Sequence, residues 1–110
     1  VQVVQPDLCV CGGLTEGKKI CDLAAIYDAS VQIHACGGPI STAAALQLEA
    51  AIPNFIIHEV HEGGLKPEIR ALCTNDHQPV NGFYDVPELP GIGQELTEKT
   101  MKEATVITIK

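Results

Sequence analysis

The chain has 110 residues, the size of one domain, and 45% of them are hydrophobic. No apolar run approaches the ~20 residues that cross a bilayer, and the first residues do not resemble a signal peptide. The net charge of −7 repels phosphate backbones and anionic membranes, and no cluster of Lys or Arg offsets it. We therefore expect neither nucleic acid nor a membrane as a partner.

The first half of the chain alternates between strand and helix patterns. Residues 1–10 predict a strand that is rich in valine and ends at Gly12-Gly13. Thr15 is the predicted N-cap of a helix over 16–27. The apolar stripe expected on that helix consists of Ile20, Leu23, Ala24 and Tyr27.

The same alternation continues to about residue 57. Residues 31–35 predict a second strand, and Gly37-Gly38-Pro39 leads into a helix over about 40–51. Phe55 opens a third strand after the break at Pro53-Asn54. The expected inner face of the second helix consists of Ala44, Ala45, Leu48 and Ala51. This β-α-β-α-β order favours an α/β fold with a parallel sheet and right-handed crossovers.

Each predicted strand ends in a residue that can carry acid/base chemistry: Asp7, His34 and Glu59. In a parallel α/β sheet the carboxyl ends of strands lie side by side, where active sites are usually built. The three side chains are therefore predicted to converge on one pocket for a small polar substrate. The competing interpretation is structural: a turn-capping aspartate, a hydrogen-bonded histidine and a glutamate in a salt bridge at the rim.

The five cysteines are Cys9, Cys11, Cys21, Cys36 and Cys73. An odd count without a secretory signal favours reduced thiols and a cytoplasmic protein. Cys9 and Cys11 are predicted to share one face of an extended segment, with Cys36 as a candidate neighbour. A zinc or redox site needs more ligands at better spacing, so buried or half-buried free thiols are the favoured interpretation.

Regular patterns fade after Val60, where Pro and Gly interrupt the sequence repeatedly. A short helix is expected within 95–103 and a final strand over 105–109. So long an irregular tail is unusual in a free-standing domain, and three parallel strands leave two open edges. Together these features predict the C-terminal part of a larger barrel.

Four stretches in order carry a resemblance to a known family. They are Gln5-Pro6-Asp7 with Gly12 to Glu16, His34 with Gly37-Gly38-Pro39, Ile52 to Phe55 leading to Glu59, and Pro87 to Gly93. The chain resembles the C-terminal third of the enolase superfamily, in its mandelate racemase and muconate-lactonizing branch. Within that branch it looks most like the galactonate dehydratase-type sugar-acid dehydratases.

The resemblance implies a modified TIM barrel with a capping domain. Residues 1–62 would supply barrel strands six to eight with their helices, and residues 63–110 an irregular segment that packs on the barrel and the capping domain. The implied partners are the remainder of the barrel, the N-terminal capping domain and further copies in a homo-oligomer. The implied cofactor is Mg²⁺, with acidic ligands upstream of Val1 and none in this chain.

The resemblance also implies roles for four residues. His34 would be the base, oriented by Asp7, and Glu59 would contact the carboxylate or enediolate of the substrate. His61 would line the pocket mouth, whereas strand alternation turns His58 away from Glu59 towards the surrounding helices. His77, among turn formers, is expected at the surface. After His34 many relatives have Asn-Pro, but this chain has Ala35-Cys36.

The expected activity is magnesium-dependent dehydration of an aldonate-type sugar acid to a 2-keto-3-deoxy acid through an enediolate. Such an enzyme is a lyase, of the hydro-lyase type. One alternative is a racemase or epimerase of a 2-hydroxy acid that uses the same His34 and Asp7. The other is a non-catalytic α/β binding module that has these rim residues by chance.

Overall fold

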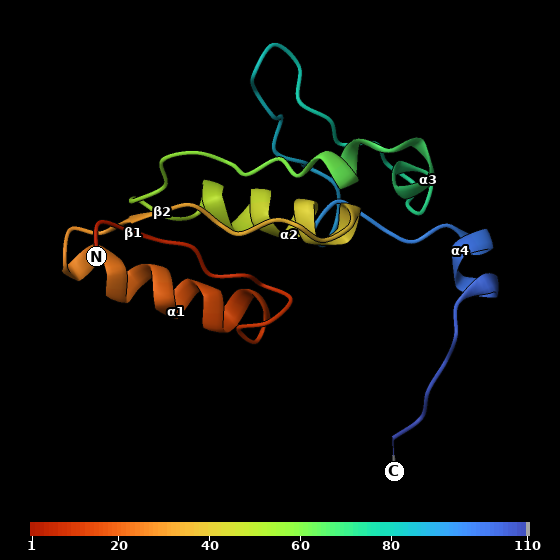
Figure 1. Ribbon diagram of the computed structural model, residues 1–110, viewed down its shortest axis with the longest axis horizontal. Coiled ribbons are helices and arrows are strands. Elements are labelled where there is room, and N and C mark those ends of the chain that lie inside the picture. Colours follow the sequence, from red (N-terminus) through yellow and green to blue (C-terminus); the bar gives the residue numbers. More distant parts are fainter. Residues whose placement is uncertain (110) are drawn as a thin grey trace.

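The computed structural model describes residues 1–109. In chain order the elements are β1 (Val3–Val4), α1 (Gly13–Ile26), β2 (Ser30–Val31), α2 (Pro39–Ala50), the 3₁₀ turn η1 (Glu62–Leu65), α3 (Pro67–Arg70) and α4 (Glu98–Glu103). Figure 1 shows α1 and α2 running alongside the strand segments, with the second half of the chain extending away from them. Among residues 1–109, no helix has both the length and the apolar character needed to cross a bilayer.

The predicted parallel strands are present but short. β1 pairs with β2 in parallel, and isolated parallel bridges join Asp7 to His34 and Val31 to Phe55. The third predicted strand therefore amounts to one bridge at Phe55. The first strand stops near Asp7 rather than at residue 10, because the next residues turn back and two of their N–H groups donate to the Asp7 carbonyl. The parallel α/β architecture predicted from the sequence is thus confirmed, with shorter strands.

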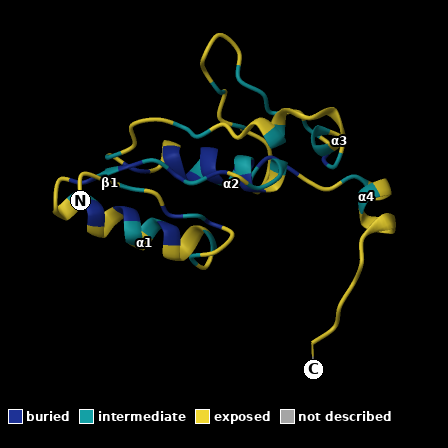
Figure 2. Ribbon diagram, in the orientation of Figure 1, coloured by how far each residue is buried: buried dark blue, intermediate teal, exposed yellow. Residues whose placement is uncertain are grey.

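The core lies between the strand segments, α1 and α2. Val31 and Ile33 are fully buried there, together with Cys21, Ala45 and Leu48. Burying a side chain of the size of Val31 or Ile33 contributes about 1.5–3 kcal/mol. Figure 2 shows the buried residues concentrated on α1, α2 and the strands between them. This core fixes the strand ends that carry the polar side chains.

The start of α1 differs from the prediction. Gly12, with φ 109°, is the N-cap, so the helix begins before Thr15. Glycine suits that left-handed backbone because it has no Cβ. One turn further on, a Cβ at Gly17 would collide with the Leu8 side chain, so glycine also permits the close approach of α1 to the first strand segment.

The apolar stripes predicted for the two helices are correct only in part. Leu23 and Tyr27 are exposed, and the buried face of α1 runs through Gly17, Cys21 and Ala24 instead. The helical period was right, but the face that meets the strands lies further round the helix. On α2, Ala45 and Leu48 are buried as predicted, whereas the predicted core residue Ala51 is exposed because the helix ends at Ala50.

The second half of the chain is irregular, as predicted. Gln94 is buried there, and its side-chain amide exchanges two hydrogen bonds with the Asn75 backbone, at 3.0 and 2.6 Å. α4 falls within the predicted helical piece at 95–103. The predicted final strand over 105–109 is wrong: these residues are exposed and unpaired, because no other strand among residues 1–109 lies beside them to complete a ladder (Figure 1).

Candidate functional site

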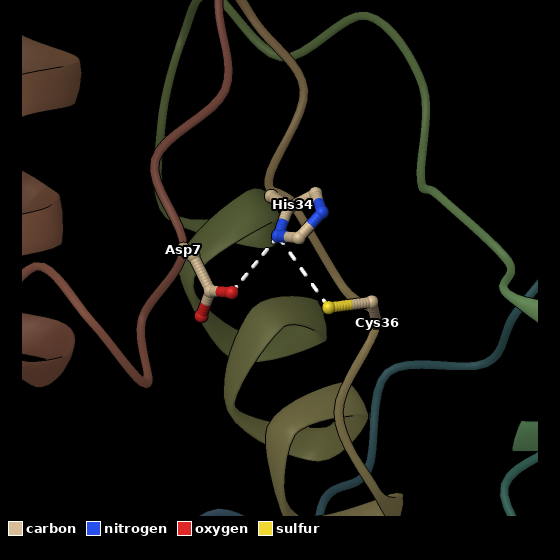
Figure 3. Close-up of side chains that lie close together, drawn as sticks. All are labelled: Asp7, His34 and Cys36. Carbon is tan, nitrogen blue, oxygen red and sulfur yellow. Dashed lines mark hydrogen bonds and ion pairs between the residues drawn. The ribbon is translucent and has the colours of Figure 1, made fainter.

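Asp7 and His34 form a hydrogen-bonded pair at the ends of neighbouring strand segments. The parallel bridge between these two residues sets their backbones side by side. The Nδ1 atom of His34 lies 2.8 Å from Oδ2 of Asp7, and the other carboxylate oxygen accepts from the backbone N–H of Cys9 at 2.7 Å. Figure 3 shows the second ring nitrogen of His34 pointing away from Asp7. The arrangement leaves Nε2 as the ring nitrogen that can meet a substrate.

The electrostatics of the pair follow from this contact. The hydrogen bond to Asp7 is the main cause that raises the pKa of His34; desolvation opposes it, and the negative charges of Glu59 and Asp7 add to the rise. The same hydrogen bond lowers the pKa of Asp7, as does the N–H of Cys9. Asp7 is therefore the anion of the pair over the neutral pH range, and it strengthens His34 as a base.

Glu59 joins the same rim through the backbone. Its Oε2 accepts a hydrogen bond of 2.9 Å from the N–H of Ala35, the residue that follows His34. The carboxylate is half-buried and close enough to affect the titration of His34. The structure therefore brings Asp7, His34 and Glu59 to one rim, as the positions of the strand ends predicted. Of the three, only Glu59 lines the hollow beside it, so the expected common pocket stays a prediction.

A hollow opens beside Glu59, and neither Asp7 nor His34 lines it. His61 lines it, and its Nδ1 also accepts from the N–H of Gly63 at 3.1 Å, whereas its place at the mouth of a pocket shared with His34 stays a prediction. His77 lines it too and bonds the Gly93 carbonyl at 2.9 Å. The sequence placed His77 at the surface because only turn formers surround it. Its position depends on contacts between residues far apart in the chain.

A second histidine–carboxylate pair lies behind the rim and was not predicted. The Nδ1 atom of His58 lies 2.7 Å from Oε2 of Glu49 on α2, with 9% and 5% of the two side chains exposed. The ring of Tyr84 meets that of His58 edge-on at 4.8 Å. The contact with α2 confirms that His58 points away from Glu59. Glu49 was missed because a glutamate in a helix usually faces solvent.

The cysteines are all free thiols within the described part of the chain. Cys21 and Cys73 are buried, and burial raises the pKa of both thiols, as expected of unreactive packing residues. Cys9 and Cys36 are exposed, contrary to the prediction. Cys9 and Cys11 lie in a turn rather than on an extended segment, so the predicted shared strand face is wrong.

Residues 1–109 contain one group of three side chains whose ligating atoms gather together. Those atoms belong to Asp7, His34 and Cys36 and lie within 4.8 Å of one another. Magnesium prefers six oxygen ligands in an octahedron. One carboxylate, one imidazole and one thiol do not make such a set, so this group does not fit a magnesium ion.

The family model and the solved structures that resemble this chain point to the same class of protein. Residues 1–100 match the family model described as "Enolase C-terminal domain-like". A structure described as a member of the enolase superfamily from Salmonella Typhimurium superposes with a TM-score of 0.95 and 61% identity, over all of this chain and 28% of that one. The architecture is therefore that of the C-terminal portion of an enolase-superfamily barrel.

Two curated proteins are also similar in sequence. D-xylonate dehydratase from Haloferax volcanii is 40% identical over 87% of this chain and 23% of its own length. D-galactarolactone cycloisomerase from Agrobacterium fabrum is 32% identical over 94% of this chain and 29% of its own length. The chain belongs to the enolase superfamily, in the mandelate racemase and muconate-lactonizing branch, as its motifs predicted. It spans about a quarter of the length of these relatives.

Proposed function

We propose that the protein carrying this chain is a hydro-lyase that dehydrates an aldonate-type sugar acid to a 2-keto-3-deoxy acid. The observation that carries the proposal is the Asp7–His34 pair, with Glu59 hydrogen-bonded to the backbone next to His34. The 40% identity to a protein named D-xylonate dehydratase supports the choice of substrate class. Magnesium dependence belongs to the same proposal, with the metal ligands supplied from outside residues 1–109.

The chemistry assigned to this chain begins with proton transfer. His34 takes the proton from the carbon next to the substrate carboxylate through Nε2, and the C–H electron pair moves into an enediolate. Asp7 holds the ring by Nδ1 and stabilises the imidazolium that forms. Glu59 hydrogen-bonds the substrate carboxylate or its enediolate in a protonated or shared-proton state.

Loss of the neighbouring hydroxyl completes the reaction. The enediolate re-forms its carboxylate as the C–O bond at the next carbon breaks. The imidazolium of His34 returns its proton, so the hydroxyl departs as water. The enol that remains becomes the 2-keto acid by losing its hydroxyl proton and gaining a proton at the next carbon. His34 thus begins and ends the cycle neutral.

The remaining parts of the proposal concern assembly and location. Residues 1–62 form barrel strands six to eight with their helices, and residues 63–110 pack on the barrel and the capping domain. The partners are the rest of the barrel, the N-terminal capping domain and further copies in a homo-oligomer, in the cytoplasm. His61 contacts substrate at the mouth of the hollow, supported by its position beside Glu59.

The test uses the intact protein with a panel of sugar acids that begins with D-xylonate. Formation of a 2-keto product is measured for the parent protein and for His34→Asn. Removing the base should lower turnover by about 10²- to 10⁴-fold while the unfolding midpoint is retained. Gln32→Asn is the matched control, because Gln32 lies two residues earlier on the same segment and bonds Gln5 at 2.8 Å. Undiminished turnover in His34→Asn would exclude His34 as the base.

A racemase or epimerase is the second candidate, favoured by the likeness to a protein named as a cycloisomerase. It would use the same His34–Asp7 pair opposite a second base. Substrate recovered from deuterated water distinguishes the two: label in recovered substrate without a 2-keto product identifies the isomerase. The non-catalytic alternative predicts neither label nor product.

A further inference from the structure

The thiol of Cys36 lies beside the Asp7–His34 pair and has no task in the proposed reaction. Its Sγ is 3.8 Å from Nδ1 of His34, the nitrogen that also contacts Asp7 (Figure 3). Within residues 1–109 the Cys36 side chain is exposed, so none of these residues covers it. An oxygen, a nitrogen and a sulfur ligand therefore surround one small space at the rim.

The backbone fixes all three groups. The parallel bridge sets Asp7 against His34, and the N–H of Cys9 orients the carboxylate so that its other oxygen faces the ring. Cys36 follows His34 by two residues, which returns its side chain to the same side of an extended segment. Immediately after it, a Cβ at Gly37 would lie 2.7 Å from Cβ of Ser41, so the turn into α2 is tight. The fold thus sets the backbone positions of the three residues.

The donor set has the chemistry of a zinc site. Zinc binds carboxylate oxygen, imidazole nitrogen and thiolate sulfur in a tetrahedron, with bond lengths of about 2.0–2.3 Å. Such bonds place nitrogen and sulfur about 3.6 Å apart, and nitrogen and oxygen about 3.4 Å apart. The distance from His34 to Cys36 already matches at 3.8 Å, whereas the 2.8 Å between His34 and Asp7 must open by roughly half an ångström.

We infer that Asp7, His34 and Cys36 form a binding site for a thiophilic divalent cation of the zinc type, separate from any magnesium site. Binding releases the thiol proton, and the ring proton of neutral His34 moves from Nδ1 to Nε2, because the ligating atoms must be unprotonated. The ion replaces the hydrogen bond between Asp7 and His34 and leaves a fourth position for water. The bound ion should also inhibit turnover, because an ion on Nδ1 takes the place of the Asp7 carboxylate that makes His34 basic. This consequence rests on the proposed function.

Cobalt(II) is the probe, because a thiolate ligand gives it a near-ultraviolet charge-transfer band and tetrahedral ligation intensifies its visible bands. The intact protein is titrated with cobalt in excess magnesium. We expect one equivalent to produce the thiolate band. Cys36→Ser should abolish that band and weaken binding by at least about 10-fold. Cys11→Ser is the matched control, since Cys11 is a free thiol outside the cluster whose Sγ faces the Gly13 carbonyl, and it should keep the band.

Two results would overturn the site: no thiolate band in the parent protein, or a band that survives Cys36→Ser. Cys36→Ala provides the same readout if the serine variant fails to fold. Zinc inhibition is then measured on the parent and on the turnover that Cys36→Ser retains, and the variant should need at least about 10-fold more zinc. Equal zinc sensitivity would overturn the inhibitory role. A thiolate band in a protein without dehydratase activity would support the site while contradicting the proposed function.

Discussion

The two histidine–carboxylate pairs have nearly the same length and opposite surroundings. His34 and Asp7 meet at 2.8 Å with 40% and 19% of their side chains exposed. His58 and Glu49 meet at 2.7 Å with only 9% and 5% exposed. A free ring nitrogen at an open rim suits proton transfer, whereas a pair enclosed by α2 and Tyr84 suits structural support. The contact alone therefore does not identify a catalytic pair; its surroundings do.

The buried pair also shows the cost of enclosure. Oε1 of Glu49 is buried without a hydrogen-bond partner among the described residues. Burial raises the pKa of the neighbouring Tyr84, and the charge of Glu49 raises it further. A buried carboxylate that is only half satisfied depends strongly on its one partner. Breaking the buried pair should therefore lower the stability of the protein, whereas breaking the pair at the rim should lower its activity.

The largest expected effect is on stability at the buried pair. His58→Ala should lower the free energy of unfolding of the intact protein by about 3–5 kcal/mol, because Glu49 would remain buried without its partner. His34→Ala is the matched control and should change the unfolding midpoint little, because that pair is open to water. Denaturant unfolding of both variants provides the measurement. A loss in His58→Ala no larger than in His34→Ala would contradict the structural role of the buried pair.

The next largest effect is on activity, and it distinguishes Glu59 from its neighbour His58, which points to the opposite side of the same segment. Glu59→Gln should lower kcat/KM by about 10- to 100-fold, because an amide cannot share a proton with the substrate as the carboxyl group does. The unfolding midpoint should stay close to that of the parent, unlike that of His58→Ala. Steady-state kinetics on the intact protein, with unfolding as the control, checks this. Unchanged kinetics would remove Glu59 from the site.

The smallest effect concerns the ring beside the buried pair. Tyr84→Leu should destabilise the protein by about 0.5–1.5 kcal/mol beyond the change in buried area, since the edge-on contact with His58 is lost. Tyr84→Phe keeps the ring and is the matched control. Equal unfolding curves for the two variants would show that the aromatic contact adds nothing to the buried pair.

The rim could be predicted from sequence, whereas the buried pair could not. Strand order and the parallel sheet followed from hydrophobic periodicity, and parallel strands bring their ends together whatever their length. Asp7, His34 and Glu59 could therefore be placed side by side without coordinates. Glu49 is a different case, because its burial depends on which part of the tail covers α2, and local pattern carries no information on that contact.

Three further differences between the sequence prediction and the structure have identifiable causes. Thr15 resembles an N-cap, but the left-handed turn at Gly12 starts α1 earlier. From sequence alone Cys36 is one of five free thiols, and only the structure places its Sγ 3.8 Å from Nδ1 of His34. Residues 105–109 alternate like a strand, yet alternation describes only the two faces of a strand and does not supply a partner. Periodicity predicts elements well, and it predicts contacts only where topology forces them.

The central claim is that His34, strengthened by Asp7, is the base. The direct measurement is the pH dependence of kcat/KM for the intact parent protein and for Asp7→Asn. A base must be neutral, and the Asp7 hydrogen bond raises the pKa of His34, so parental activity should rise with pH through a value above that of an ordinary histidine. Asp7→Asn removes that stabilisation of the imidazolium. The rising limb should move to lower pH while the maximal rate falls. A limb at the same pH in both proteins would contradict the account.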